Sequence, residues 1–229
     1  FQAAARPQIT KLCAVKDYDS MNDLIIRTSK YSSYLIGIIG VPLFIEMDFV
    51  LRLWLKEVPE YTVIFTRLTI IQAFIQSVDF PIGAGIHAVG KMKLPNITSS
   101  IIYMMILPVS YVAIKVGASP VIAYIMIIAV YPLALMTDML ILHKFTSFCI
   151  KTFLWNVLAR ALFILPLVGY LTFRISSHLP QSFVRLIITV VISICLNSLL
   201  IYFLGISRGE RRYINDYIYL KIRLKRSDE

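Results

Sequence analysis

Residues 182–204 read SFVRLIITVVISICLNSLLIYFL, an apolar run whose single charged residue is Arg185. A helix of this length crosses the roughly 30 Å hydrocarbon core of a bilayer at about 1.5 Å per residue. Because only internal hydrogen bonds satisfy the backbone of a single span where water is absent, the run predicts a transmembrane helix. Five similar runs precede it, at Ser33–Trp54, Tyr61–Ile82, Leu94–Val116, Ser119–Leu142 and Phe153–Arg174. The sequence therefore predicts an all-α, polytopic membrane protein with six transmembrane helices.

The composition agrees with this interpretation. Hydrophobic residues make up 58% of the chain and charged residues 16%, and the mean hydropathy is +0.76, which lies outside the range of soluble domains. A net charge of +10 would suggest nucleic acid as the partner of a soluble chain. Here most of the 23 Lys and Arg residues fall before the first run, after the second and fourth runs, and in the tail. By the positive-inside rule both chain ends are predicted to be cytoplasmic, and no nucleic-acid partner is expected.

Three parts are predicted along the chain. Residues 1–31 are expected to form a cytoplasmic linker after a preceding span of a longer protein, and residues 32–205 to form the six-helix transmembrane bundle. Residues 206–229 are expected to be a basic tail. Its apolar positions share one helical face, which predicts an amphipathic helix on an anionic cytoplasmic leaflet. These positions are Tyr213, Tyr217, Leu220 and Leu224.

Sequence motifs for catalysis are missing. The chain has no HExxH, CxxC, Walker or GxSxG pattern and no glycine-rich phosphate loop. Cys13, Cys149 and Cys195 are odd in number and far apart, which fits neither a disulfide framework nor a metal site. The sequence predicts a protein that is not an enzyme and that has no cofactor and no metal.

The second predicted span holds the best candidates for a binding site. Gln72, Gln76 and Asp79 lie at i, i+4 and i+7, so they share one face, which Thr69 extends. An Asp or Arg at a helix centre costs about 2.5–3.5 kcal/mol when it faces lipid, so this face is expected to look into the protein or a hydrated cavity. Arg67 is a further candidate for the cavity. Alternatively, Asp79 and Arg67 lie near the two membrane boundaries and reach toward headgroups, which the two glutamines are too deep to do.

Two other charged sites have both functional and structural interpretations. Arg160 lies one turn from Asn156 in the fifth span, where it would present a positive charge to an anionic ligand or extend toward the headgroups. Asp48 precedes Arg52 by four residues, the spacing of a helical ion pair. Five of the six spans also contain a proline that can kink the helix, a feature that recurs in transporters. These are Pro42, Pro81, Pro108, Pro132 and Pro166.

Several short stretches of the sequence resemble those of one family of membrane proteins. Arg6-Pro7-Gln8-Ile9-Thr10-Lys11, followed by the segment from Lys16 to Asp19, resembles a cytoplasmic connection in bacterial lipid-linked polysaccharide flippases. The rest of the chain resembles the later half of such proteins in three places, namely Val41-Pro42-Leu43, the turn from Leu53 to Tyr61, and Ala88-Val89-Gly90-Lys91-Met92-Lys93. The chain thus resembles an O-antigen or capsule-repeat flippase of the multidrug/oligosaccharide-lipid/polysaccharide exporter superfamily.

The resemblance implies two helical bundles around a central cavity, of which this chain would supply the second. It implies a multi-pass protein of the bacterial inner membrane that flips undecaprenyl-pyrophosphate-linked oligosaccharide repeat units by alternating access. Its partners would be this lipid-linked substrate, membrane lipids and the missing N-terminal bundle. A cation-coupled multidrug exporter of the same superfamily is the alternative. A membrane-embedded polysaccharide polymerase or ligase fits less well, because the predicted outer loops are short. No site is carried over from the family, so Arg67, Gln72, Gln76, Asp79 and Arg160 rest on the residues alone.

Overall fold

The computed structural model describes residues 2–207 and 209–212, and over these residues the chain is helical with no strand. Six helices are long and apolar enough to cross a membrane, which confirms the predicted number. Two of them contain a π-helical segment, and a shorter helix, α1 (Gln2–Ala14), precedes the first. The six are α2 (Tyr18–Trp54), α3 (Thr62–Val89), α4 with α5 (Lys93–Met104, Ile106–Lys115), α6 (Val121–Thr146), α7–η1–α8 (Ile150–Phe153, Leu154–Ala159, Arg160–Ser176) and α9–η2 (Phe183–Leu200, Ile201–Gly205).

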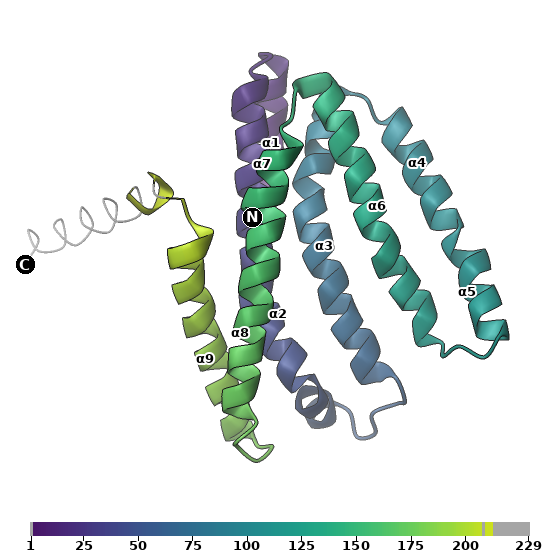
Figure 1. Ribbon diagram of the computed structural model, residues 1–229, viewed down its shortest axis with the longest axis vertical. Coiled ribbons are helices and arrows are strands. Elements are labelled where there is room, and N and C mark those ends of the chain that lie inside the picture. The colour runs from purple at the N-terminus through teal and green to yellow at the C-terminus, as the bar shows by residue number, and fades with distance from the viewer. Residues whose placement is uncertain (1, 208, 213–229) are drawn as a thin grey trace, which may run out of the picture.

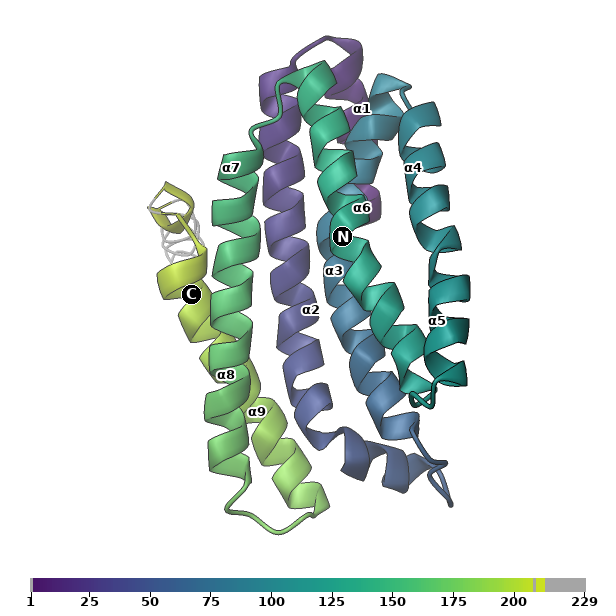
Figure 2. The same cartoon turned by 45° about the vertical axis from the view of Figure 1, so that its right-hand side comes forward.

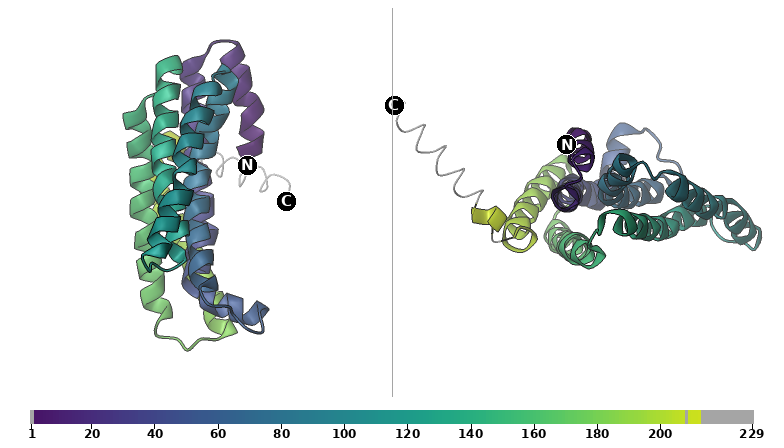
Figure 3. Two further views of the ribbon diagram at one scale, coloured as in Figure 1. Left: turned by 90° about the vertical axis from the view of Figure 1, so that its right-hand side faces the viewer. Right: turned by 90° about the horizontal axis from the view of Figure 1, so that it is seen from above.

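The helices stand side by side in an elongated row, as the view from above in Figure 3 shows. Helix α2 lies near the middle, with α8 and α9 on one side and α3, α6 and α4–α5 on the other (Figures 1 and 2). The α1–α2, α3–α4 and α6–α7 loops meet at one end, at the top of Figure 1. We call this the basic end, because Lys16 and Lys91 lie in these loops and three more lysines lie in the adjoining ends of helices, namely Lys93, Lys144 and Lys151. The remaining loops meet at the opposite end.

The first membrane-length helix, α2, begins earlier than the apolar run in the sequence predicted. Helix α2 starts at Tyr18 rather than at Ser33, and the Asp17 carboxylate caps it by accepting a hydrogen bond from the Ser20 amide at 3.1 Å. Residues 1–31 are the predicted cytoplasmic linker, and in the described part they form α1 and the first turns of α2, which pack against each other and α3. The amphipathic helix predicted for the tail lies outside the described residues.

Two prolines have local structural consequences that the sequence suggested. Pro108 lacks an amide hydrogen and its ring crowds the carbonyl of Met104. The third membrane span is broken at that level into α4 and α5. Pro81 likewise cannot bond the Ser77 carbonyl in α3, and the Gln2 side-chain amide donates to this oxygen at 2.7 Å instead. Helix α1 is thereby attached to the middle of α3.

The main hydrophobic core lies toward the basic end. Ile9, Ile25, Ile82, Leu142 and Phe153 are all buried there and bring together α1, α2, α3, α6 and α7. A polar contact reinforces the core: the Asn22 side-chain amide donates to the Thr146 carbonyl at 2.8 Å, and the Thr146 hydroxyl donates back to the Asn22 side-chain oxygen at 3.1 Å. A second cluster joins α2, α8 and the end of α9. The basic half therefore holds the helices in fixed positions around α2.

Candidate functional site: a polar seam between α3 and α6

Helices α3 and α6 run in the same direction and present polar side chains to each other. On α3 the polar side chains are those predicted to share one face. On α6 the polar side chains recur every seven residues, so they also share a face. We call this set the polar seam. It comprises Thr69, Gln72, Gln76 and Asp79 of α3 and Tyr124, Tyr131 and Asp138 of α6.

A chain of hydrogen bonds runs along the seam. The Tyr124 hydroxyl lies 2.9 Å from the Thr69 hydroxyl and donates to the Gln72 side-chain oxygen at 2.5 Å. The Gln72 side-chain amide donates in turn to the Tyr131 hydroxyl at 3.3 Å, and Gln76 donates to the same oxygen at 2.7 Å. The two glutamines are therefore satisfied by α6, and the stripe on α3 is half of a two-helix polar surface.

The seam ends in two carboxylates toward the basic end. Asp79 lies about one turn beyond Gln76 on α3, and Asp138 lies seven residues beyond Tyr131 on the same face of α6. Each has one buried carboxylate oxygen that accepts no hydrogen bond from the described residues. The Tyr103 ring of α4 packs edge-on against Tyr131 at 5.6 Å between centroids and closes this end of the seam from one side. The seam thus changes along its length from hydrogen-bonded amides and hydroxyls to acidic groups with spare acceptor capacity.

The seam is not sealed inside the bundle. Thr69 and Gln76 are exposed, and Gln72, Tyr124 and Tyr131 are half-buried, although all five lie within helices of membrane-spanning length. Polar groups at this depth are costly against lipid, so they normally face other helices or a hydrated space. The seam can therefore form one wall of a polar path across the membrane.

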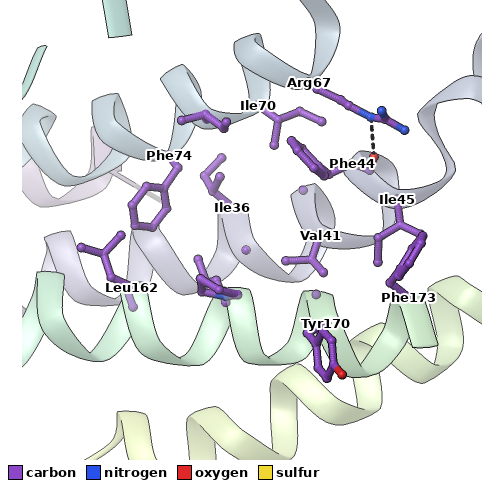
Figure 4. Close-up of a pocket in the computed structure, with 17 residues that line it drawn as sticks. Ile36, Val41, Phe44, Ile45, Arg67, Ile70, Phe74, Leu162, Tyr170 and Phe173 are labelled. Atoms are coloured by element: carbon purple, nitrogen blue, oxygen red, sulfur yellow. Dashed lines mark hydrogen bonds between the residues drawn. The ribbon is translucent and has the colours of Figure 1, made fainter. Parts of the chain in front are cut away.

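The other two candidates lie elsewhere. Arg67 points away from α6: its Nε donates to the Phe44 carbonyl of α2 at 3.0 Å, and its guanidinium lies 5.5 Å from the centre of the Phe44 ring. Figure 4 shows Arg67 at one end of an apolar pocket of about 630 Å³ between α2, α3 and α8. Arg160 donates to the Gly205 carbonyl at 3.1 Å, an oxygen that also accepts from the Tyr34 hydroxyl at 3.2 Å. This guanidinium holds the end of α9 against α8.

Sequence reasoning missed Tyr124 and Tyr131, although their seven-residue spacing with Asp138 was visible. Each residue taken alone is ordinary in a membrane helix, and the spacing gains meaning only when α3 is known to lie opposite. Two long-range ion pairs were missed as well. Glu46 of α2 accepts from Arg185 Nε at 2.9 Å and from the Thr189 hydroxyl at 3.0 Å, both in the sixth span. The predicted pair of Asp48 with Arg52 is present, at 3.2 Å.

The second long-range pair fastens the segment after α9. Glu210 accepts hydrogen bonds from Lys30 Nζ at 2.7 Å and from the Tyr31 hydroxyl at 2.9 Å. Partial burial raises the pKa of the Glu210 carboxylate, but hydrogen bonds from Lys30 and from Ser207 outweigh it and lower the pKa to about 2. The carboxylate is therefore charged at neutral pH, when it compensates the buried Lys30 ammonium.

No protein-family model, curated protein or solved structure matches this chain. The likeness to lipid-linked polysaccharide flippases therefore rests on the short sequence motifs, and the site rests on its geometry.

Proposed function

We propose that this chain is one helical bundle of a transporter that moves lipid-linked oligosaccharide repeat units across a membrane. The observation that supports the proposal is the polar seam, which runs along two membrane-length helices and stays half exposed. Such a surface suits the hydroxyl-rich head of an oligosaccharide, because amides and hydroxyls can both donate to sugar hydroxyls and accept from them. The short motifs described above favour the same class of substrate.

In this proposal the seam faces a second bundle, and the cavity between the two bundles opens to each side of the membrane in turn. The oligosaccharide head lies in the cavity while the lipid tail remains in the bilayer. The basic end lies in the cytoplasm, because Lys-rich loops are retained on that side. The membrane would be a bacterial inner membrane.

Breaking the seam should impair export more than expression. Replacing both Gln72 and Gln76 with Leu removes every amide that bonds Tyr131 and makes the middle of the seam apolar. We expect surface polysaccharide, normalised to the protein in the membrane, to fall to about a tenth or less, which corresponds to about 1.4 kcal/mol on the transport barrier. The measurement is made in cells that depend on this protein in its full-length form for their surface polysaccharide.

Gln181→Leu is the matched control, because it makes the same chemical change in the exposed α8–α9 loop. This variant should export at the wild-type level. Wild-type export by the double variant would mean that the seam is helix packing. Loss of resistance to a cationic drug with unchanged polysaccharide export would favour a multidrug exporter instead.

A further inference from the structure

The pocket between α2, α3 and α8 lies apart from the polar seam and has a different chemistry. Its walls are almost entirely apolar, and they include Gly169, which has no side chain to fill the space beside it. A Cβ added at Gly169 of α8 would have Val41 as its nearest neighbour, 3.9 Å away, so the space beside this glycine is open. Apolar residues that border the pocket, such as Leu162 and Phe173, are strongly exposed. The pocket therefore opens sideways, toward the hydrocarbon of the bilayer.

One end of the pocket carries a positive charge. The Nε atom of Arg67 donates to the Phe44 carbonyl, and its two terminal nitrogens donate no hydrogen bond within the described chain. Arg67 lies five residues after the start of α3 at Thr62, or about 7.5 Å along the axis, which is near headgroup depth. Phe74 lies a further seven residues, or about 10 Å, toward the bilayer centre (Figure 4).

We propose that this pocket binds an anionic phospholipid from the leaflet at the end of the molecule opposite the basic end. One acyl chain would lie in the pocket and the phosphate would bind Arg67. The charge at headgroup depth selects this occupant, since a phosphate can accept hydrogen bonds from both terminal guanidinium nitrogens. An apolar helix of another protein, or of a second copy, would fill the pocket but leave those nitrogens unpaired. The inference is independent of the proposed export function, because the pocket and the seam share no residue.

The test uses phosphatidylglycerol with a photoreactive acyl chain, added to the purified protein in phosphatidylcholine vesicles. Labelled peptides are then identified by mass spectrometry. In the wild type we expect labels on pocket residues such as Ile70, Phe74 and Leu165. A phosphatidylcholine probe should give about tenfold less label there, because the choline cation of that lipid neutralises its phosphate and repels the Arg67 guanidinium.

Two substitutions separate the contact with the acyl chain of the lipid from the contact with its headgroup. Gly169→Leu fills the pocket and should reduce labelling about tenfold, as expected when several methylene groups lose their site. Gly83→Leu is its control, since a Cβ at Gly83 would meet no atom within 4 Å beyond the adjacent backbone of its own helix. Arg67→Gln should abolish the preference for phosphatidylglycerol. Arg174→Gln, which removes an exposed arginine at the same end of the molecule, should keep that preference.

The proposal is overturned if Gly169→Leu, with its unfolding temperature retained, is labelled like the wild type, or if both lipid probes label the wild-type pocket equally. It is also overturned if a polyprenyl phosphate at equal concentration displaces the phosphatidylglycerol probe, because the pocket would then belong to a transported lipid. Crosslinks between two copies through the pocket would assign it to a protein interface.

Discussion

Arg185→Met should lower the free energy of unfolding by about 3–5 kcal/mol, because it leaves the Glu46 carboxylate charged and buried without its cation. Glu46 is only 2% exposed and Arg185 13% exposed. The Thr189 hydroxyl remains as a donor to Glu46 but carries no charge. Arg185 also donates to the Leu179 carbonyl in the α8–α9 loop at 3.2 Å, so the substitution releases this loop as well. The measurement is denaturant-induced unfolding in detergent micelles.

Arg52→Met is the matched control at the same end of the molecule. Its partner is Asp48, and this pair is largely exposed, so its removal should cost less than about 1 kcal/mol. Equal losses for the two variants would show that the contact of Glu46 with Arg185 does not hold α9 against α2.

Glu210→Gln should lower the free energy of unfolding by about 1.5–3 kcal/mol at neutral pH, the range for hydrogen bonds to charged groups. The substitution leaves the Lys30 ammonium, whose side chain is 6% exposed, without a counter-charge. In the wild type the pKa of Glu210 is lowered from 4.5 to about 2, so the stabilisation is complete above about pH 4.5 and is lost as the pH falls toward 2.

The pH profile of the unfolding temperature distinguishes this contact from general packing. The difference between the wild type and Glu210→Gln should be constant from pH 5 to neutrality and should shrink between about pH 4.5 and 2. Asp23→Gln changes an exposed carboxylate of α2, which pairs with Arg27 one turn away, and serves as the control. A difference for Glu210→Gln that persists unchanged at pH 2 would contradict the proposed role of its charge.

The six helices could be predicted because their apolar runs are set by the thickness of a bilayer. The start of α2 could not be predicted in this way, because hydropathy detects lipid contact and the helix continues beyond it. Its polar first turns, including the pair of Asp23 with Arg27, are helical because they pack on α1 and α3. The break before Pro108 follows from the missing amide hydrogen and was accessible from the sequence.

About half of the candidate site could be predicted from the sequence. The shared face of Gln72, Gln76 and Asp79 follows from helical periodicity, but the partners on α6 depend on which helices are neighbours. Arg160 shows the same limit. Its sequence position suggested a charge presented to a ligand, whereas the structure places the guanidinium on the Gly205 carbonyl, 45 residues away in the chain. Arg67, a separate candidate for the cavity, bonds to the Phe44 carbonyl of α2 and not to the polar seam.

Thiol accessibility in the full-length protein tests whether the polar seam lines a hydrated path. Cys13, Cys149 and Cys195 are first replaced with Ser, and a single cysteine is then placed at Gln76 or at Leu133. Leu133 is 58% exposed and lies two residues from Tyr131, so that it points away from the seam at a similar depth. We expect a charged, water-soluble thiol reagent to modify the cysteine at Gln76 at least about tenfold faster than the one at Leu133, because a thiol ionises in water but not in hydrocarbon. Equal rates at the two positions would contradict this expectation.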